Sequence, residues 1–305
     1  SGMSRGLGDV YKRQIIHGLS SRANLFADDL KLFLSSPRDS GSYLDNMSVL
    51  QDDINKLQSR AESWGLIFSA HKCSHLRFVR PYANNPPPVP LFINNSPIQF
   101  LSSARDLGLE IDFSLKFHSH IRLVASKASG VSNNLLRGTI CRSQDFMKSI
   151  FVAHVRPIID FCSPVWNTGY IGDIKLLESV QRRWTKLVDG MSELSYYNRL
   201  KALSLYSIWG RLLRADLILV WKIFNDVNSP LTGLLELSGN TRTRGNPRKL
   251  RTILADTEIR RRFFTVRVVR DWNDLPTEVV MSSSLELFKS RLPSALGDRL
   301  YFYYD

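Results

Sequence analysis

The sequence predicts an α+β fold in which short strands come first and helices follow. Up to about residue 115, short apolar runs alternate with turn-forming residues around one long amphipathic segment, a pattern typical of antiparallel hairpins with a single helix. From residue 117 onward, apolar residues recur at steps of three and four, which indicates helices packed on a core. A chain of 305 residues can hold one large domain or two ordinary ones.

Residues 1–14 are set apart from the predicted fold. They show no hydrophobic period, and residues 9–14 (DVYKRQ) resemble the translation of a sequencing adapter. We interpret the segment as an adapter-derived scar, and a genuine flexible start is the alternative.

The most informative local feature is a pair of adjacent carboxylates, Asp28 and Asp29, between the apolar runs 24–27 and 30–33. The two runs suit short strands that meet at a tight turn. A charged pair in such a hairpin is costly unless it is compensated, and Mg²⁺ takes one or two carboxylates together with substrate phosphates. The pair therefore predicts a metal site at the hairpin tip, with a simple solvated turn as the alternative.

One long helix is predicted next. Over 42–64, apolar residues recur at three- and four-residue steps, at Leu44, Met47, Leu50, Ile54, Leu57, Ala61 and Trp64. Gly65 stands where helices commonly end. The elements expected after it are strands at 66–68 and 76–78 around a turn at 71–73, a proline-rich linker at 81–90, a hairpin of 91–93 with 98–100 around Asn94 and Asn95, and a strand at 107–112.

Helices account for most of the remaining chain. The predicted ranges are 118–137, 143–159, 173–188, 196–203, 207–225 and, near the end, 284–292, with an arginine-rich loop at 239–251. In the third of these helices, one apolar face is formed by Ile174, Leu177, Val180, Trp184 and Leu187. Arg182, Arg183 and Lys186 lie on other faces of that helix, which leaves them available to a partner.

The charge balance indicates a polyanionic partner. The net charge is +13 and the isoelectric point about 9.8, values that suit nucleic acid or an acidic membrane surface. Cys73, Cys141 and Cys162 are odd in number and widely spaced, which suits a reducing, intracellular compartment. No apolar run approaches the roughly 18 residues of a membrane span, so we expect no membrane association.

A basic stretch near the C-terminus is a second candidate site. Its candidate nucleic-acid-binding cations are Arg242, Arg244, Arg248, Lys249, Arg251, Arg260, Arg261 and Arg262. Cations can track phosphates, and aromatic rings can stack on bases. For the neighbouring Phe263, Phe264 and Trp272 we favour core packing, and for the cations contact with nucleic acid.

Four passages, in this order, resemble the reverse transcriptase of non-LTR (LINE-type) retrotransposons. They are the Phe26-Ala27-Asp28-Asp29 box; residues 64–68 (WGLIF) followed by Lys72; residues 106–112 (DLGLEID); and residues 155–157, 163–166 and 177–183. Residues 263–276 and 285–292 also fit the C-terminal tail of the family. The likeness covers nearly everything from about residue 15 onward.

The resemblance implies a partial palm, made of antiparallel hairpins and one helix, followed by a mostly α-helical thumb and C-terminal region. It divides the chain into residues 1–14 (the scar), 15–80 (partial palm), 81–115 (linker and primer-grip-like hairpin), 116–238 (helical thumb and connection) and 239–305 (basic C-terminal region). It also implies Mg²⁺ as cofactor, RNA template, DNA primer and nucleotides as partners, and a nuclear location.

Specific roles follow from the same resemblance. The family's reaction is RNA-directed DNA synthesis by two-metal phosphoryl transfer. Asp28 and Asp29 are the implied catalytic and metal-binding residues, with Asp28 the main ligand because adjacent strand residues point to opposite faces. Lys72 matches a lysine near the departing pyrophosphate. Leu107 and Gly108 match the primer grip, where glycine permits close approach.

The sequence also departs from the family. Two-metal chemistry needs carboxylates from two strands, and the family's first catalytic aspartate and its fingers lie upstream of the Asp-Asp box. We therefore expect this chain alone to be inactive as a polymerase. Two other interpretations stay open, a non-catalytic nucleic-acid-binding module and a decayed retrotransposon reading frame.

Overall fold

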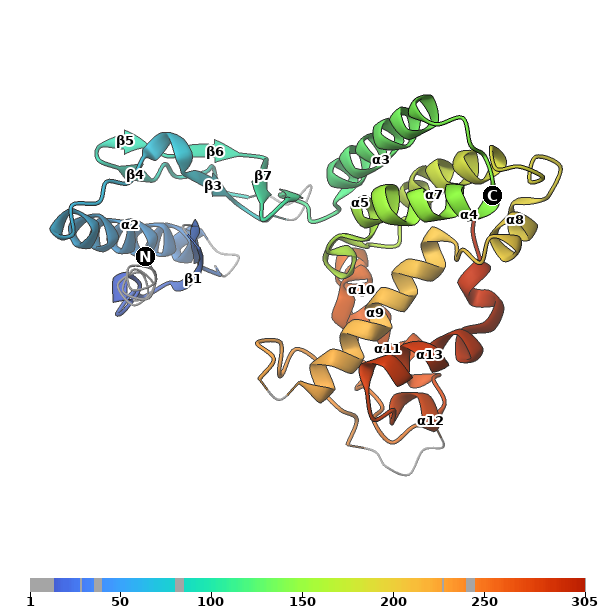
Figure 1. The fold of residues 1–305 in the computed structure, drawn as a ribbon. Coiled ribbons are helices and arrows are strands. Elements are labelled where there is room, and N and C mark those ends of the chain that lie inside the picture. The colour runs from blue at the N-terminus through green and yellow to red at the C-terminus, as the bar shows by residue number, and fades with distance from the viewer. Residues whose placement is uncertain are drawn as a thin grey trace, which may run out of the picture. The chain divides into compact units, whose positions relative to one another are not determined.

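The computed structural model describes residues 14–27, 29–35, 40–79, 85–226, 228–239 and 245–304. The chain falls into two compact units, one holding the residues up to 106 together with 111–114, the other residues 107–110 and 115–305. Short strands and one long helix make up the first unit, and helices make up nearly all of the second (Figure 1). The predicted α+β class is confirmed.

The first unit begins with an antiparallel hairpin of β1 (Arg22–Phe26) and β2 (Asp29–Phe33). Phe26 pairs with Asp29, so residues 27 and 28 alone connect the strands. Ala27 has a φ of +52°, the left-handed conformation that tight hairpin turns require. The predicted hairpin at the acidic pair is therefore present. Asp28 itself lies outside the described residues.

Helix α2 (Ser40–Ser63) covers one face of this hairpin. Leu57 and Ala61 on the helix are buried and pack with Leu25, Leu30 and Leu32 of the strands. The helix is the one predicted from the apolar period. It ends as predicted at Gly65, whose φ is +69°.

The strand predicted at 66–68 is wrong. The backbone N–H of Leu66 donates to the carbonyl of Ala61 at 2.8 Å, so the segment caps α2 instead of joining a sheet. Ile67 is 86% exposed. The expected turn at 71–73 largely coincides with the short 3₁₀ helix η1 (Ala70–Lys72).

The strand predicted at 76–78 is β3 (Ser74–Leu76), which ends before Phe78. It pairs in parallel with β6 (Gln99–Leu101), whereas only antiparallel pairs were expected. The hairpin of β4 (Phe92–Ile93) and β5 (Ser96–Pro97) lies between them in the chain. The long connection between them allows β6 to run parallel to β3.

Two further turns have both central residues in the left-handed region. Asn94 and Asn95, with φ of 49° and 59°, form the predicted turn between β4 and β5. The second strand of this hairpin is Ser96–Pro97 and not 98–100 as predicted, because residues 99–101 belong to β6 and pair with β3. Leu107 and Gly108, with φ of 45° and 89°, join β7 (Ser103–Asp106) to β8 (Leu109–Asp112). The strand predicted at 107–112 therefore begins two residues late, because its first two residues form a turn.

The second unit is a set of helices. In order they are α3 (His118–Gly138), α4 (Gln144–Ile150), the π-helical turn η2 (Phe151–Val155), α5 (Arg156–Asp160), α6 (Ser163–Trp166), α7 (Ile171–Lys186), α8 (Tyr196–Ala202), α9 (Ile208–Asn225), α10 (Glu258–Arg262), α11 (Phe264–Asn273), α12 (Thr277–Val280), α13 (Leu285–Leu296) and the 3₁₀ helix η3 (Gly297–Tyr301). Every predicted helix is present, and α6, α10, α11 and α12 are additional.

The single helix predicted at 143–159 is divided into α4, η2 and α5. Pro157, in the first turn of α5, has no N–H and its ring clashes with a regular preceding turn. A π-helical turn just before it accommodates this conflict. At the other end of the unit, α13 continues past Pro293 to Leu296, further than predicted, because Leu296 is buried in the core.

The core of this unit gathers around α9, α11 and α13. Trp272 and Phe288 are fully buried there, and their ring centroids are 6.1 Å apart. The apolar face predicted for α7 is buried at Ile174, Leu177, Val180 and Trp184, whereas the chain leaves the helix before Leu187, which is 46% exposed. Of the basic loop predicted at 239–251, the described residues form no helix, and Leu250 bridges to Leu237.

Candidate functional site

The acidic hairpin presents one face to α2 and leaves the other open. Asp29, the described residue of the acidic pair, is exposed at the start of β2 opposite Phe26, which is 62% exposed. Leu30 and Leu32 point the other way and pack against α2. Strand alternation thus places the Asp29 carboxylate on the open face.

A network of hydrogen bonds fixes the segment that leads into β1. The Asp53 carboxylate of α2 is fully buried and accepts the backbone N–H of Ser21 at 2.7 Å and of Ser20 at 3.2 Å. Burial raises the pKa of Asp53, but these bonds and the Lys56 ammonium outweigh it and lower the pKa to about 2. Sequence reasoning missed this residue, although an aspartate on the apolar side of a helix was a visible signal.

A second connection runs from β2 to β7. Lys31 forms an ion pair with Asp106, and both side chains are about one-quarter to one-third exposed. Like Asp53 and its partners, this pair lies far apart in the sequence, so no local pattern predicts it. Together the two sets of interactions hold the acidic hairpin from both sides within the first unit.

Lys72 and the turn at Leu107-Gly108 are both accessible. Lys72 ends η1 with its side chain exposed, and among the described residues it has no hydrogen-bonding or ionic partner to hold it. Gly108 lies against the Phe161 ring, which a Cβ at this position would approach to 3.2 Å. Leu107 is 45% exposed. Both the close approach of the Phe161 ring and the positive φ therefore favour glycine at position 108.

The three candidate cations of α7 divide into two kinds. Arg183 and Lys186 are exposed, whereas Arg182 lies over the rings of Tyr196 and Tyr303 at 4.8 and 5.0 Å. Stacking on two rings gives Arg182 a structural role in holding the C-terminus. The two exposed cations remain available to an anionic partner.

The C-terminal cations also divide. Arg242 and Arg244 lie outside the described residues. Arg248 donates to Asn225 at 3.1 Å, and Arg251 pairs with Glu236 at 2.8 Å. Lys249 is half-buried. The Arg251 pair is largely exposed, so it contributes little to stability and leaves the guanidinium free to exchange partners.

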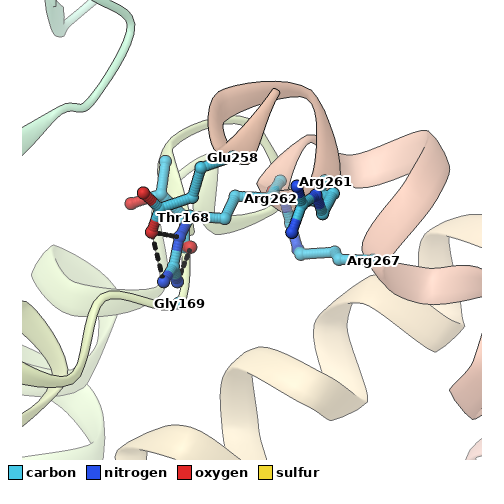
Figure 2. Close-up of a pocket in the computed structure, with 6 residues that line it drawn as sticks. All are labelled: Thr168, Gly169, Glu258, Arg261, Arg262 and Arg267. Carbon is cyan, nitrogen blue, oxygen red and sulfur yellow. Dashed lines mark hydrogen bonds and ion pairs between the residues drawn. The ribbon is translucent and has the colours of Figure 1, made fainter. Parts of the chain in front are cut away.

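Arg260, Arg261 and Arg262 lie together on α10. Arg260 lies 5.3 Å from the centre of the exposed Phe263 ring, and Arg261 donates to the carbonyl of Ala255 at 3.2 Å. Both side chains are exposed. Arg262 instead bridges Glu258, at 2.9 Å, and the carbonyl of Thr168, at 3.1 Å (Figure 2).

Arg261 and Arg262 border a hollow of about 620 Å³, whose lining consists of Thr168, Gly169, Glu258, Arg261, Arg262 and Arg267. Arg267 is held by two hydrogen bonds to the buried Asp216, at 2.8 and 2.9 Å. Burial raises the pKa of Asp216 to about 6, against the opposing effect of Arg267. Arg267 is thus engaged in a largely buried ion pair, and among the described residues that line the hollow Arg261 is the exposed cation.

Two of the three aromatic residues of this stretch are buried in the core, as predicted. Phe264 and Trp272 are buried, and Phe263 is 46% exposed. In the described part of the chain, no group of three or more His, Cys, Asp or Glu side chains could hold a metal ion. Asp28, the other member of the acidic pair, lies outside that part.

No family model, curated protein or solved structure matches the chain. Among the described helices, none combines the length and the apolar character that crossing a membrane demands.

Proposed function

We propose that residues 15–305 form the later part of the palm, the thumb and the C-terminal region of an RNA-directed DNA polymerase of the non-LTR retrotransposon kind. The observation that carries the proposal is the hairpin of β1 and β2, whose second strand begins at Asp29, packed on a single long helix. A second tight hairpin with Leu107-Gly108 at its tip follows in the order of the family motifs.

In this proposal, Asp28 and Asp29 are carboxylate ligands for Mg²⁺, which when bound would stabilise the charge that develops on the transferring phosphoryl group. The exposed Lys72 would approach the departing pyrophosphate, and Leu107 with Gly108 would contact the primer backbone. RNA template, DNA primer and nucleotides would be the partners, and the nucleus the place of action.

A long genomic or transcript read across residues 14 and 15 tests the family assignment. We expect an upstream reading frame that encodes a further palm strand with an aspartate and the fingers that bind template. A native stop codon followed by a start codon at this junction would remove the polymerase assignment.

A second candidate function is a non-catalytic nucleic-acid-binding module. It is favoured by the net charge of +13 and by the exposed cations Arg183, Lys186, Arg260 and Arg261. Binding of RNA to the 305-residue chain should weaken steeply as salt rises, because cations that neutralise phosphates release counterions. Affinity that is absent even at low salt would exclude this function.

A further inference from the structure

A second group of cations lies on α5 and α9 of the second unit. Arg211, Arg214 and Lys222 share one face of α9, opposite the face that enters the core. They line a hollow of about 260 Å³ together with Asp160, Pro164, Ala215, Ile218 and Leu219. The apolar members on α9 form one continuous strip, so the hollow combines an apolar wall with charged ones.

The charges around this hollow are unbalanced. Arg211 pairs with Asp160 through both guanidinium branches, with Nε and Oδ1 3.1 Å apart. Arg156, on α5 one turn before Asp160, lies close enough to both for their charges to move its pKa. Among the described residues, Arg156, Arg214 and Lys222 have no carboxylate of their own. Three cations and one carboxylate thus line the hollow.

Two of these guanidinium groups also lack hydrogen-bond acceptors. The Nε atoms of Arg156 and Arg214 are buried and have no partner within the described part of the chain. Burial, and next the charge of Arg211, lower the pKa of Arg156 to about 10. Burial also lowers the pKa of Arg214. A partly buried guanidinium charge without a carboxylate of its own is unfavourable, so an anion in the hollow would stabilise Arg211 and Arg214, which line it.

We propose that Arg211 and Arg214 bind a phosphate group in this hollow, as a cluster to which Arg156 adds a nearby positive charge. Guanidinium forks match phosphate oxygens in geometry and in charge. The hollow is smaller than the roughly 300–1,000 Å³ of pockets that enclose a whole ligand, so it suits a single phosphate whose carbon skeleton extends along the apolar wall. The phosphate belongs either to a nucleic-acid backbone or to a free phosphate compound. Such binding does not require the polymerase function.

Titration with inorganic phosphate in a low-chloride buffer tests the cluster directly. Wild-type chain should bind it saturably, and Arg214→Gln should weaken the affinity about tenfold or more, since hydrogen bonds to a charged group contribute about 1.5–3 kcal/mol. Arg122→Gln removes the same charge from an exposed position on α3 and should leave the affinity unchanged. Arg214→Lys, which keeps the charge and loses the fork, should be intermediate and serves in place of Arg214→Gln if that variant does not fold.

A second arm distinguishes the source of the phosphate. Oligonucleotide binding is measured across a salt series for the same variants. If the site takes the nucleic-acid backbone, Arg214→Gln lowers the slope of log affinity against log salt by about 0.7 to 0.9 for each phosphate that the chain no longer neutralises. An unchanged slope with weakened phosphate binding assigns the site to a free phosphate compound. If neither phosphate affinity nor slope differs between wild type and Arg214→Gln beyond the effect of Arg122→Gln, the proposal is wrong.

Discussion

At the scale of single residues, Glu178 of α7 is the most unusual ionisable group in the described part of the chain. Its side chain is 2% exposed. One carboxyl oxygen accepts a hydrogen bond from the Tyr196 hydroxyl, and the other accepts one from the backbone N–H of Ile208 at 2.9 Å. Burial raises its pKa to about 7, although these hydrogen bonds oppose the shift. Burial therefore favours the protonated carboxyl, whereas the hydrogen bonds that join α7, α8 and the start of α9 favour the carboxylate.

This pKa predicts the direction of a pH effect. Between about pH 4.5 and 7, the folded chain binds the Glu178 proton more tightly than the unfolded chain does, so the free energy of unfolding should fall as pH rises, by up to roughly 3 kcal/mol. In Glu178→Gln this part of the decline should be absent. Urea unfolding at several pH values, with the exposed Glu193→Gln as control, measures it. Equal slopes in Glu178→Gln and wild type would contradict the assignment.

Asp53 should show the opposite pH effect. Its pKa is lower in the folded chain, so its stabilisation is fully present above about pH 4 and is lost as pH falls towards 2. Asp53→Ala leaves the N–H groups of Ser20 and Ser21 without their acceptor, which should cost about 2–3 kcal/mol. Hydrogen exchange at Ser21 reports the loss. Protection as high in Asp53→Ala as in the exposed control Asp52→Ala would refute it.

At the scale of elements, the start of α9 and the end of the chain fit together through a glycine. A Cβ at Gly210 would lie 2.3 Å from the carbonyl oxygen of Leu300 in η3. Ser207 strengthens the same contact, because its backbone N–H donates to that oxygen at 3.0 Å. Backbone approaches backbone here, so no rotamer change can relieve an added methyl group.

Gly210→Ala should therefore destabilise the second unit by about 1–3 kcal/mol, the usual cost of overpacking, despite the higher helix propensity of alanine. Gly172→Ala on α7 is the matched control, because a Cβ there meets no atom within 4 Å. Thermal unfolding followed by circular dichroism compares the two. If Gly210→Ala unfolds at or above the temperature of Gly172→Ala, the contact between α9 and η3 is not as described.

Elements were predictable from sequence where periodicity or turn chemistry is local. The apolar periods predicted α2, α3, α7 and α9, and Asn94-Asn95 predicted a hairpin turn. The parallel pairing of β3 with β6 could not be foreseen, because both strands are three residues long and their partners are chosen by tertiary packing. The short helices α10 and α12 span barely more than one turn, which is too little to show a period.

At the scale of the whole molecule, composition describes the net charge but not which cations are free. Arg262 and Arg267 lie in the basic C-terminal region, yet each is paired with a carboxylate. Arg214 belongs to no basic cluster in the sequence, yet it lines a hollow in the fold. Pairing depends on residues far apart in the chain, such as Asp216 with Arg267, and so becomes visible only in the fold. The acidic pair was evident from sequence because its flanking strands are adjacent.

Primer extension tests the proposed polymerase function most directly. The assay uses an RNA template, a DNA primer and Mg²⁺ with the reading frame extended upstream of Ile15, in wild-type, Asp28→Ala and Asp52→Ala forms. We expect product from wild type and Asp52→Ala, and none from Asp28→Ala or from the isolated 305-residue chain, since the proposal places the second acidic strand upstream. Undiminished product from Asp28→Ala would contradict the assignment of the acidic hairpin as part of a polymerase active site.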